Sequence, residues 1–279
     1  MKIINKRYFN TTCHIVSVNP TELRLETHNG IPNKRENIHN MFGTPELSEV
    51  TCLKANGTFF NIADPKSEIM GGGRGDCFLN VAWDGKYFMM EPEISKGLKE
   101  VSSSYALIRN GQRDHTNETK LKEILGRNPR MMMGQRANGE MVFIAADGRK
   151  LFEKGLTSEE ERSVCSLEGL RYAVNNDGGG STAIIVNDKQ LNKAYDGRPL
   201  GYIWVGYRKW HKDELPSLKK GSKGMWVHLL QRILNVPADG NFGSGTNRAV
   251  RIYQSEHGLK VDGQVGSQTW EALQTIYQV

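Results

Sequence analysis

Asp177-Gly178-Gly179-Gly180-Ser181-Thr182 is the stretch of sequence that decides the fold. Apolar segments flank it on both sides, at residues 172–176 and 183–186, and both are typical of short buried strands. A plain hairpin needs only one or two glycines to reach positive φ, so three in succession indicate a backbone that closely approaches another group. Consecutive N–H groups in such a turn can bind an anion, and Asp177 can supply acid–base or nucleophilic chemistry. The alternative is a flexible polar turn with no chemical role.

The composition is that of an ordinary soluble globular protein. The 279 residues are 38% hydrophobic and 24% charged, which suits about two domains with separate cores. No window approaches the roughly 20 consecutive apolar residues of a membrane span. The segment Met1–Tyr8 is basic but lacks the apolar core of a secretory signal peptide. We therefore expect synthesis in the cytoplasm and, if the protein acts outside it, export or release by another system.

The charge pattern and the cysteines exclude several classes of protein. The net charge of +6 comes without a run of Lys and Arg interleaved with aromatic residues, so no nucleic-acid partner is expected. A weakly basic surface suits an anionic cell-wall polymer, although simple solubility explains it equally well. No histidine pair has metal-ligand spacing, so we assign no metal site and expect no cofactor. Four cysteines are too few for a disulfide scaffold and are predicted to be reduced core residues: Cys13, Cys52, Cys77 and Cys165.

A charged, proline-containing segment near residues 208–221 is typical of a linker. We therefore divide the chain into a domain at 1–208, a linker at 209–218 and a domain at 219–279. The last of these contains an internal repeat, in which residues 239–250 match residues 262–273 at an offset of 23 residues. Each copy begins with an Asp-Gly turn and continues as an amphipathic helix. With an earlier apolar segment at 225–234, the repeat predicts three short helices around one small core.

This repeat closely resembles the three-helix type of peptidoglycan-binding domain, over about residues 219–279. The features that match it are Gly224, Val227, Leu230-Gln231, Leu234, Asp239-Gly240, Phe242-Gly243, Thr246, Ala249-Val250, Tyr253-Gln254, Gly258-Leu259, Asp262-Gly263, Val265-Gly266, Thr269-Trp270 and Leu273. Most of these residues occupy turn and core positions. The resemblance implies attachment to bacterial peptidoglycan and implies no catalysis.

The domain at 1–208 alternates short apolar segments with Gly, Asn and Asp. One helix is predicted over Ser158–Leu170, because Thr157 has the character of an N-cap and acidic residues follow it. The domain is therefore mainly β with a few helices, and the chain as a whole belongs to the α+β class. The candidate strands are Thr12–Val18, Val50–Leu53, Ala106–Ile108, Met141–Ala145, Ala173–Asn175, Thr182–Val186 and Tyr202–Val205. The run Met131-Met132-Met133 is predicted to lie in the core.

Several fragments of this domain share one design, in which a strand ends in polar residues and glycine. They are, in order, Asn56-Gly57-Thr58-Phe59-Phe60, Pro129-Arg130, Asp147-Gly148-Arg149, Gly155-Leu156-Thr157, Asn175-Asn176-Asp177-Gly178-Gly179-Gly180-Ser181 and Arg198. Their order and spacing resemble the phosphodiester glycosidase family, whose known chemistry removes N-acetylglucosamine from a phosphodiester. The chain departs from that pattern at Asn176, where an apolar residue is usual, and at Thr58, where Gly is usual.

The resemblance implies cleavage of the C1–O bond of a sugar-1-phosphodiester through an oxocarbenium-like state. Asp177 is then the candidate nucleophile or general base, and Arg130 and Arg198 are candidates for bidentate phosphate binding. Asn56 is grouped with Asp177 and Arg130 as a candidate catalytic residue. The remaining candidates, for substrate binding, are Asn175, Gly178, Gly179, Gly180, Ser181, Thr182 and Asp147. Each has a structural alternative, such as a turn residue, a cap or a surface ion pair.

Together the two resemblances predict a cell-wall-targeted hydrolase of the phage lysin type, released to the wall by a holin. A bond between teichoic acid and peptidoglycan is the favoured substrate, because it is a sugar-1-phosphodiester in many Gram-positive walls. One alternative is a hydrolase that cleaves the glycan or the polymer elsewhere. Another is a non-catalytic wall-binding or virion protein with a degenerate glycosidase fold.

Overall fold

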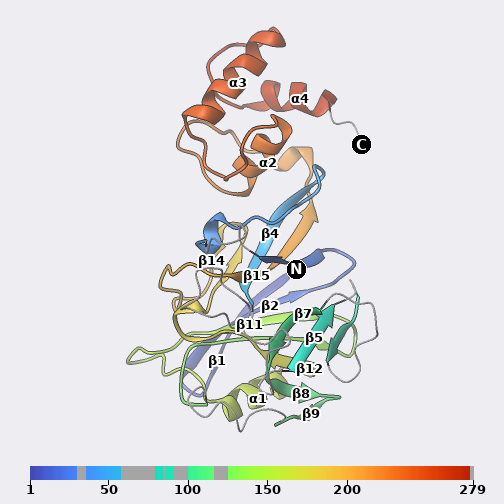
Figure 1. The fold of residues 1–279 in the computed structure, drawn as a ribbon, viewed down its shortest axis with the longest axis vertical. Coiled ribbons are helices and arrows are strands. Elements are labelled where there is room, and N and C mark those ends of the chain that lie inside the picture. Colours follow the sequence, from blue (N-terminus) through green and yellow to red (C-terminus); the bar gives the residue numbers. More distant parts are fainter. Residues whose placement is uncertain (30–35, 58–78, 84–85, 91–99, 116–124, 277–279) are drawn as a thin grey trace. The chain divides into compact units, whose positions relative to one another are not determined.

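The computed structural model describes residues 1–29, 36–57, 79–83, 86–90, 100–115 and 125–276 (Figure 1). Two sequence predictions, the departure at Thr58 and the reduced state of Cys77, lie outside these residues. The chain forms two compact units. Unit 1 comprises Met1–Met41 and Leu53–Gly206, and unit 2 comprises Phe42–Cys52 and Tyr207–Val279. Mainly β structure in the first and helices in the second confirm the predicted α+β class.

Unit 1 is built on an antiparallel sheet of seven strands. In spatial order these are β1 (Lys2–Tyr8), β2 (Thr11–Val18), β11 (Met141–Ala146), β10 (Arg130–Arg136), β12 (Leu170–Asn175), β8 (Ala106–Arg109) and β9 (Gln112–Arg113). The central strands are buried along almost their whole length, and the methionines at 131–133 are fully buried, as predicted. Strand β1 forms one edge and is largely exposed, so it carries no apolar pattern by which the sequence could reveal it.

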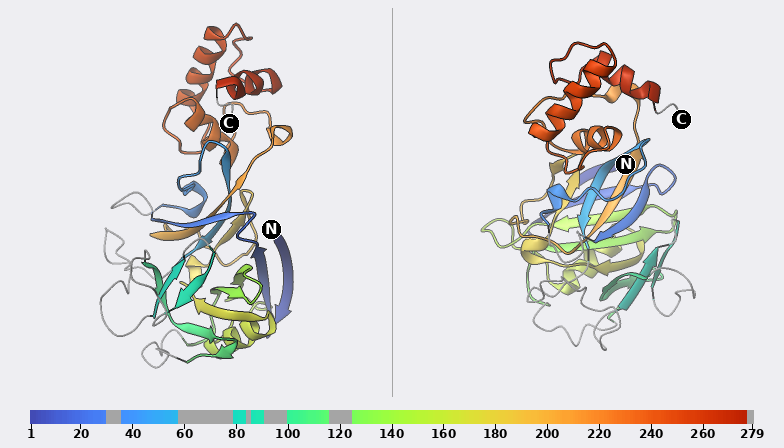
Figure 2. Two further views of the ribbon diagram at one scale, coloured as in Figure 1. Left: turned by 90° about the vertical axis from the view of Figure 1, so that its right-hand side faces the viewer. Right: turned by 45° about the horizontal axis from the view of Figure 1, so that its top comes forward.

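Two further sheets complete the β structure. The five-stranded sheet has the order β14 (Lys189–Gln190), β13 (Ile184–Val186), β4 (Glu49–Asn56), β15 (Tyr202–Lys209) and β3 (Arg24–Asn29). The three-stranded sheet has the order β6 (Phe88–Met90), β5 (Leu79–Trp83) and β7 (Glu100–Ser104). Phe143 of β11 and Trp204 of β15 meet edge to face with ring centroids 6.3 Å apart, which joins the two larger sheets through a buried aromatic pair. Figure 2 shows the strands of unit 1 from two further directions.

Helix α1 (Ser158–Leu167) begins where the sequence predicted. The Thr157 side chain accepts from the Glu160 N–H, and the Glu160 side chain accepts from the Thr157 N–H, which is a complete capping box. The helix ends three residues earlier than predicted, because Gly169 takes a positive φ of 70° behind the C-cap Glu168. Val164 and Cys165 pack from the helix onto the core of the seven-stranded sheet. Cys13, Cys52 and Cys165 are buried in the core, as predicted.

Unit 2 contains α2 (Met225–Ile233), α3 (Ser244–Glu256) and α4 (Ser267–Ile276), and the predicted repeat is visible in its hydrogen bonds. The Gln231 amide donates to Asp239 Oδ1 and Thr246 Oγ1, at 2.8 and 3.0 Å, and accepts from the Gly240 N–H. The equivalent residues in the second copy make the same bonds, around Gln254. Each buried glutamine thus ties one helix to the next Asp-Gly turn and to the helix after it.

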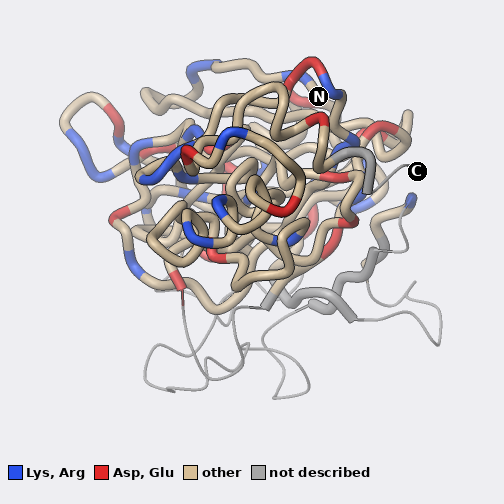
Figure 3. Tube along the Cα trace, turned by 90° about the horizontal axis from the view of Figure 1, so that it is seen from above, with Lys and Arg blue, Asp and Glu red and all other residues tan. Residues whose placement is uncertain are grey.

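The core of unit 2 also includes residues from outside the helices. Phe42 and Val50, which precede the glycosidase-like fragments in the sequence, are buried in it, and Phe42 stacks on His228 with ring centroids 4.6 Å apart. The predicted linker segment contributes Trp210 and Leu215 to the same core. Within the described residues no helix has the length and apolarity needed to cross a membrane. Basic and acidic residues are interspersed along the trace (Figure 3).

Candidate active site

The glycine-rich stretch connects two different sheets of unit 1. Strand β12 belongs to the seven-stranded sheet, whereas β13 belongs to the five-stranded sheet and pairs with β4 and β14. The segment is therefore a crossover and not a hairpin. Gly179–Ser181 form one 3-10 turn in it, and Gly179 takes a φ of 61°. The Gly179 N–H donates to the Pro129 carbonyl at 2.9 Å, which fixes the turn against the start of β10.

All three glycines are required by close approach or by backbone conformation. A Cβ at Gly178 would lie 2.7 Å from the Pro129 carbonyl oxygen. A Cβ at Gly180 would overlap the Asp196 carboxylate and the Arg198 guanidinium. Gly179 lies in the left-handed region, where a side chain is strained. The sequence argument for a close approach thus holds, and the groups approached are the chain's own carbonyl and a charged pair.

The N–H groups of Gly178, Gly179 and Ser181 do not form the predicted anion-binding nest. The Gly179 N–H is bonded to Pro129, and the Ser181 N–H donates to the Gly178 carbonyl at 3.2 Å. The Gly178 N–H bonds to the carboxyl group of Asp177. These donors are used within the protein, so an anion here has to be held mainly by side chains.

Asp177 is anchored through its backbone while its carboxyl group lies beside the turn. Its N–H donates to the Gly57 carbonyl at 2.9 Å, and its carbonyl accepts from Asn56 Nδ2 at 2.7 Å. Burial raises the pKa of the Asp177 carboxyl group to about 6, although hydrogen bonds from Ser181 and Gly178 and the charge of Arg198 oppose the shift. The residue keeps some solvent exposure. It is thus a reachable carboxyl group that changes its charge near neutral pH, as catalytic acids and bases often do.

Asn56 holds this arrangement together. It lies at the end of β4, its Oδ1 accepts from the Ala183 N–H at 2.8 Å, and its Nδ2 donates to the Asp177 carbonyl. The side chain is 1% exposed, so both ends of its amide are committed to the protein backbone. The structure therefore makes Asn56 a residue that positions Asp177, where the sequence had grouped it with the catalytic residues.

Arg130 is buried and does not present its guanidinium group to solvent. Its Nε donates to the Leu156 carbonyl at 3.0 Å and lies 3.6 Å from Glu161, and its Nη2 donates to the Gly126 carbonyl at 2.5 Å. Its Cδ passes 3.8 Å from the position of a Cβ on Gly178. The side chain thus supports the turn from within the protein, and its Nε and Nη2 donors are bonded to backbone carbonyls.

The Asp147 carboxylate also makes its contacts within the protein. It is 3% exposed, with Oδ2 at 3.1 Å from His14 Nε2 and Oδ1 accepting from the Lys193 N–H at 2.6 Å. These bonds join β2, the end of β11 and the segment after β14. The sequence placed Asp147 among the substrate-binding residues, whereas its carboxylate is occupied by protein donors.

Two arginines reach the glycine turn from its accessible side. Arg198 is half-buried and forms a bidentate pair with Asp196, with Nε to Oδ1 at 2.9 Å and Nη2 to Oδ2 at 2.6 Å. Arg149 is exposed, has a φ of 59°, and places Nη2 3.1 Å from the position of a Cβ on Gly179. The sequence singled out Arg198 as a substrate-binding candidate. From the Asp-Gly-Arg triplet it singled out Asp147 and not Arg149. Arg149 could have been chosen by its residue type, because binding of a phosphate requires a cation.

Several predicted sugar-binding side chains are fully buried beside Asp177. Asn175 and Thr182 are 0% exposed, and neither the amide of Asn175 nor the hydroxyl of Thr182 has a hydrogen-bond partner in the described structure. The amide of Asn176, the first departure from the family pattern, is in the same state. An unpaired buried polar group is costly and therefore uncommon. Three of them lie within eight residues at this crossover. The described residues offer no cluster of three or more His, Cys, Asp or Glu side chains arranged to hold a metal ion.

Two family models match the chain, each over a different range of residues. The model of the phosphodiester glycosidase family matches residues 55–206, and that of a peptidoglycan binding domain matches residues 227–273. The first match spans more than half of the chain, which therefore belongs to the phosphodiester glycosidase family, with a peptidoglycan-binding domain following the family domain.

Individual relatives are more distant. The SPbeta prophage-derived uncharacterized protein YomE of Bacillus subtilis is 33% identical over 108 residues, which are 37% of this chain and 16% of that protein. The chain thus matches a small part of that longer relative. The catalytic domain of zebrafish N-acetylglucosamine-1-phosphodiester alpha-N-acetylglucosaminidase shares the fold, with a TM-score of 0.52 and 17% identity over 75% of this chain and 82% of that one. A hypothetical protein from Synechocystis is also similar in fold, with a TM-score of 0.55 and 11% identity over 74% and 61% of the two chains.

Proposed function

We propose that this protein hydrolyses a sugar-1-phosphodiester in a bacterial wall polymer, at the Asp177 carboxyl group. The observation that carries the proposal is the combination of a carboxyl group with a pKa of about 6 and two arginines that lie against the same glycine turn. A phosphodiester brings one negative charge beside the anomeric carbon. Arg149 supplies positive charge at this turn, Arg198 adds a guanidinium group whose charge is shared with Asp196, and Asp177 acts as the nucleophile or the general base.

The order of events follows from these contacts. The arginines hold the phosphate, which replaces part of its hydration by fixed charge. The ionised Asp177 either attacks the anomeric carbon or removes a proton from the attacking water, while the C1–O electron pair leaves with the phosphate. Because a phosphomonoester is a stable leaving group, a strong general acid is not required. Asn56 and Arg130 keep Asp177 and the turn in place and do not touch the substrate.

The wall is the proposed location of that substrate. The peptidoglycan-binding domain holds the enzyme at peptidoglycan, and in many Gram-positive walls the anionic teichoic acid is joined to it through a sugar-1-phosphodiester. The prophage origin of the B. subtilis relative supports a phage lysin that a holin releases. On this proposal the sugar that loses the phosphate becomes a new reducing end, and the phosphate stays on the other product as a phosphomonoester.

Mass analysis of material released from purified walls tests this proposal. With teichoic acid present, the wild-type protein should release polymer, with a new reducing sugar on one product and a phosphomonoester on the other, and Asp177→Asn should release none. From walls stripped of teichoic acid, neither protein should release material. Glycan fragments released from stripped walls would favour a peptidoglycan hydrolase, and release of nothing from either wall would favour a non-catalytic wall-binding protein.

A further inference from the structure

The most exposed large apolar side chains of the described structure lie side by side on one turn of unit 1. This turn, residues 150–154, follows β11, and its tip is formed by Leu151 and Phe152, which are 82% and 76% exposed. Single apolar residues are common on protein surfaces, whereas adjacent large ones at such exposure often mark a place where the protein meets another surface. Phe9, which is 43% exposed, lies in the β1–β2 turn, whose Asn10 carbonyl accepts from the Lys154 N–H at 3.3 Å. Exposed apolar residues are thus concentrated on two neighbouring turns.

The turn at 150–154 is held in one shape by the rest of unit 1. Lys150 and Glu153 exchange both backbone hydrogen bonds, at 3.0 and 3.1 Å. The Arg7 guanidinium donates to the Phe152 carbonyl at 2.7 Å and pairs with the Glu153 carboxylate at 3.0 Å. The same carboxylate accepts from the Thr12 N–H at 2.6 Å. The two apolar side chains are therefore presented by a fixed backbone, so little conformational entropy is lost when a partner covers them.

Positive charge flanks the tip on both sides. Lys150 precedes it and Lys154 follows it, both are exposed, and neither side chain has an ion pair within the part of the chain that the structure describes. Glu153 is the acidic residue of this turn, and its charge is matched by Arg7. The turn thus combines two apolar side chains with two available ammonium groups.

This combination fits an anionic lipid surface. Apolar side chains can enter the boundary between headgroups and acyl chains while lysine ammonium groups remain at the lipid phosphates. A second protein requires a much larger contact, since each partner of a stable complex buries about 800 Å². A polymer of sugars and phosphates has no apolar region to cover Leu151, which offers no ring on which a sugar can pack.

We propose that the turn at 150–154 binds the surface of an anionic membrane, with Leu151 and Phe152 inserted among the lipids and the two lysines on lipid phosphates. The residue before this turn is Arg149, whose Nη2 lies 3.1 Å from the position of a Cβ on Gly179. A bound membrane therefore lies close to the candidate active site. This contact is separate from the peptidoglycan-binding domain and does not depend on the proposed function.

Co-sedimentation of the full-length protein with lipid vesicles tests the inference. The wild type should bind vesicles of phosphatidylglycerol and phosphatidylcholine in equal parts, and bind vesicles of phosphatidylcholine alone more weakly. Replacing the tip by Leu151→Ser with Phe152→Ser should weaken binding to the anionic vesicles about tenfold or more. Lys150→Gln with Lys154→Gln should weaken the same binding about tenfold and remove most of the difference between the two kinds of vesicle.

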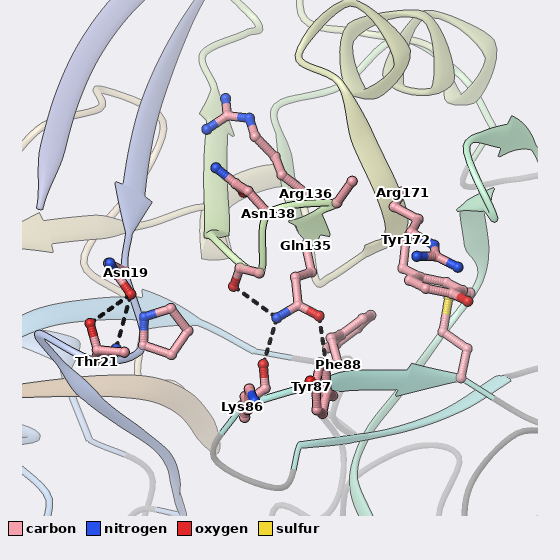
Figure 4. Close-up of a pocket in the computed structure, with 14 residues that line it drawn as sticks. Asn19, Thr21, Lys86, Tyr87, Phe88, Gln135, Arg136, Asn138, Arg171 and Tyr172 are labelled. Atoms are coloured by element: carbon pink, nitrogen blue, oxygen red, sulfur yellow. Dashed lines mark hydrogen bonds between the residues drawn. The ribbon is translucent and has the colours of Figure 1, made fainter.

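Tyr87→Ala is the matched control and should bind as the wild type does. Tyr87 is also an exposed aromatic beside a lysine, at 52% exposure and 5.0 Å from Lys86 Nζ to the ring centroid. It lines the pocket around Gln135 and Gly139, which precedes β11, whereas the proposed membrane contact follows β11 (Figure 4). The six residues of that strand separate the two places by roughly 20 Å.

The assignment is overturned if the wild type does not bind anionic vesicles, if it binds both kinds equally, or if the serine variant binds normally. A dimer that the serine variant loses in analytical ultracentrifugation, without vesicle binding, would identify a second copy of the chain as the occupant. Binding of a soluble glycerol phosphate oligomer with the same dependence on the tip, again without vesicle binding, would identify the wall polymer. Melting curves check that the variants are folded. Vesicle binding involves no hydrolysis, so its result stands whether or not Asp177 is catalytic.

Discussion

At the scale of single residues, the site depends on a carboxyl group that folding makes harder to ionise. The pKa of Asp177 is raised from 3.8 to about 6, so between these values the folded state binds the proton more strongly than the unfolded state. Stability therefore falls as the pH rises through this range, and the cost is fully present above about pH 6. An ionisable group kept at such a cost is typical of a functional site.

This gives a prediction on stability. Asp177→Asn removes the ionisation and should stabilise the protein at pH 7.5 by up to about 3 kcal/mol, the full value of the pKa shift. At pH 4, where the folded wild type is protonated, the difference should be small. Thermal melting at the two pH values measures it. An unchanged or lower Tm at pH 7.5 would show that the carboxylate is stabilised in place, contrary to the burial described.

The arginines provide a second prediction, with one variant as the control of the other. Arg149→Lys keeps the charge but loses the planar fork, and we expect kcat/KM on a soluble diester to fall by a factor corresponding to about 1–3 kcal/mol with little change in Tm. Arg130→Lys leaves the carbonyls of Leu156 and Gly126 and the charge of Glu161 poorly paired. It should lower the free energy of unfolding by about 2–4 kcal/mol. The opposite result, in which Arg130→Lys lowers kcat/KM and Arg149→Lys lowers the stability, would indicate that Arg130 contacts the substrate.

At the scale of elements, the crossover from β12 to β13 decides what the glycine turn can do. Gly180 allows Asp196 and Arg198 to lie against the backbone, and Gly179 allows the left-handed step between the two sheets. Gly180→Ala should displace Arg198 and lower kcat/KM about tenfold or more. Gly245→Ala is the control for a general glycine effect, because that glycine lies in α3 with open space around it and no positive φ. Equal kinetic effects of the two substitutions would argue against a specific contact at Gly180.

The same scale shows what the sequence could and could not predict. The start of α1 and the internal repeat were predictable, because capping boxes and Asp-Gly turns act locally. The burial of Arg130 was not, since it depends on carbonyls 4 and 26 residues away that only the fold brings together. Arg149 was missed for a related reason: its neighbour Gly179 lies on another element. Asp177 could be singled out from the sequence because its signal, three adjacent glycines, is itself local.

At the scale of the whole molecule, the chain combines a family domain with a wall-binding domain. The core of unit 2 includes Phe42, which is 4% exposed, stacks on His228 and lies against Gly240. Phe42→Ala should therefore destabilise unit 2 by about 3–5 kcal/mol and reduce the fraction of protein that sediments with purified peptidoglycan at elevated temperature. A fragment of residues 219–279, which lacks Phe42, should melt lower than unit 2 in the full chain. Equal stability would show that Phe42 adds little to the core.

The central claim is that Asp177 carries out the chemistry while the wall-binding domain acts separately. Its most direct test is the turnover of a soluble methyl phosphodiester of N-acetylglucosamine 1-phosphate, measured together with sedimentation on purified peptidoglycan. Asp177→Asn is nearly isosteric, and we predict that it lowers kcat by about a hundredfold or more, with wild-type sedimentation. In the wild type, kcat should rise as the pH passes through about 6, because the ionised carboxylate is the active form. Wild-type turnover in Asp177→Asn would contradict the mechanism.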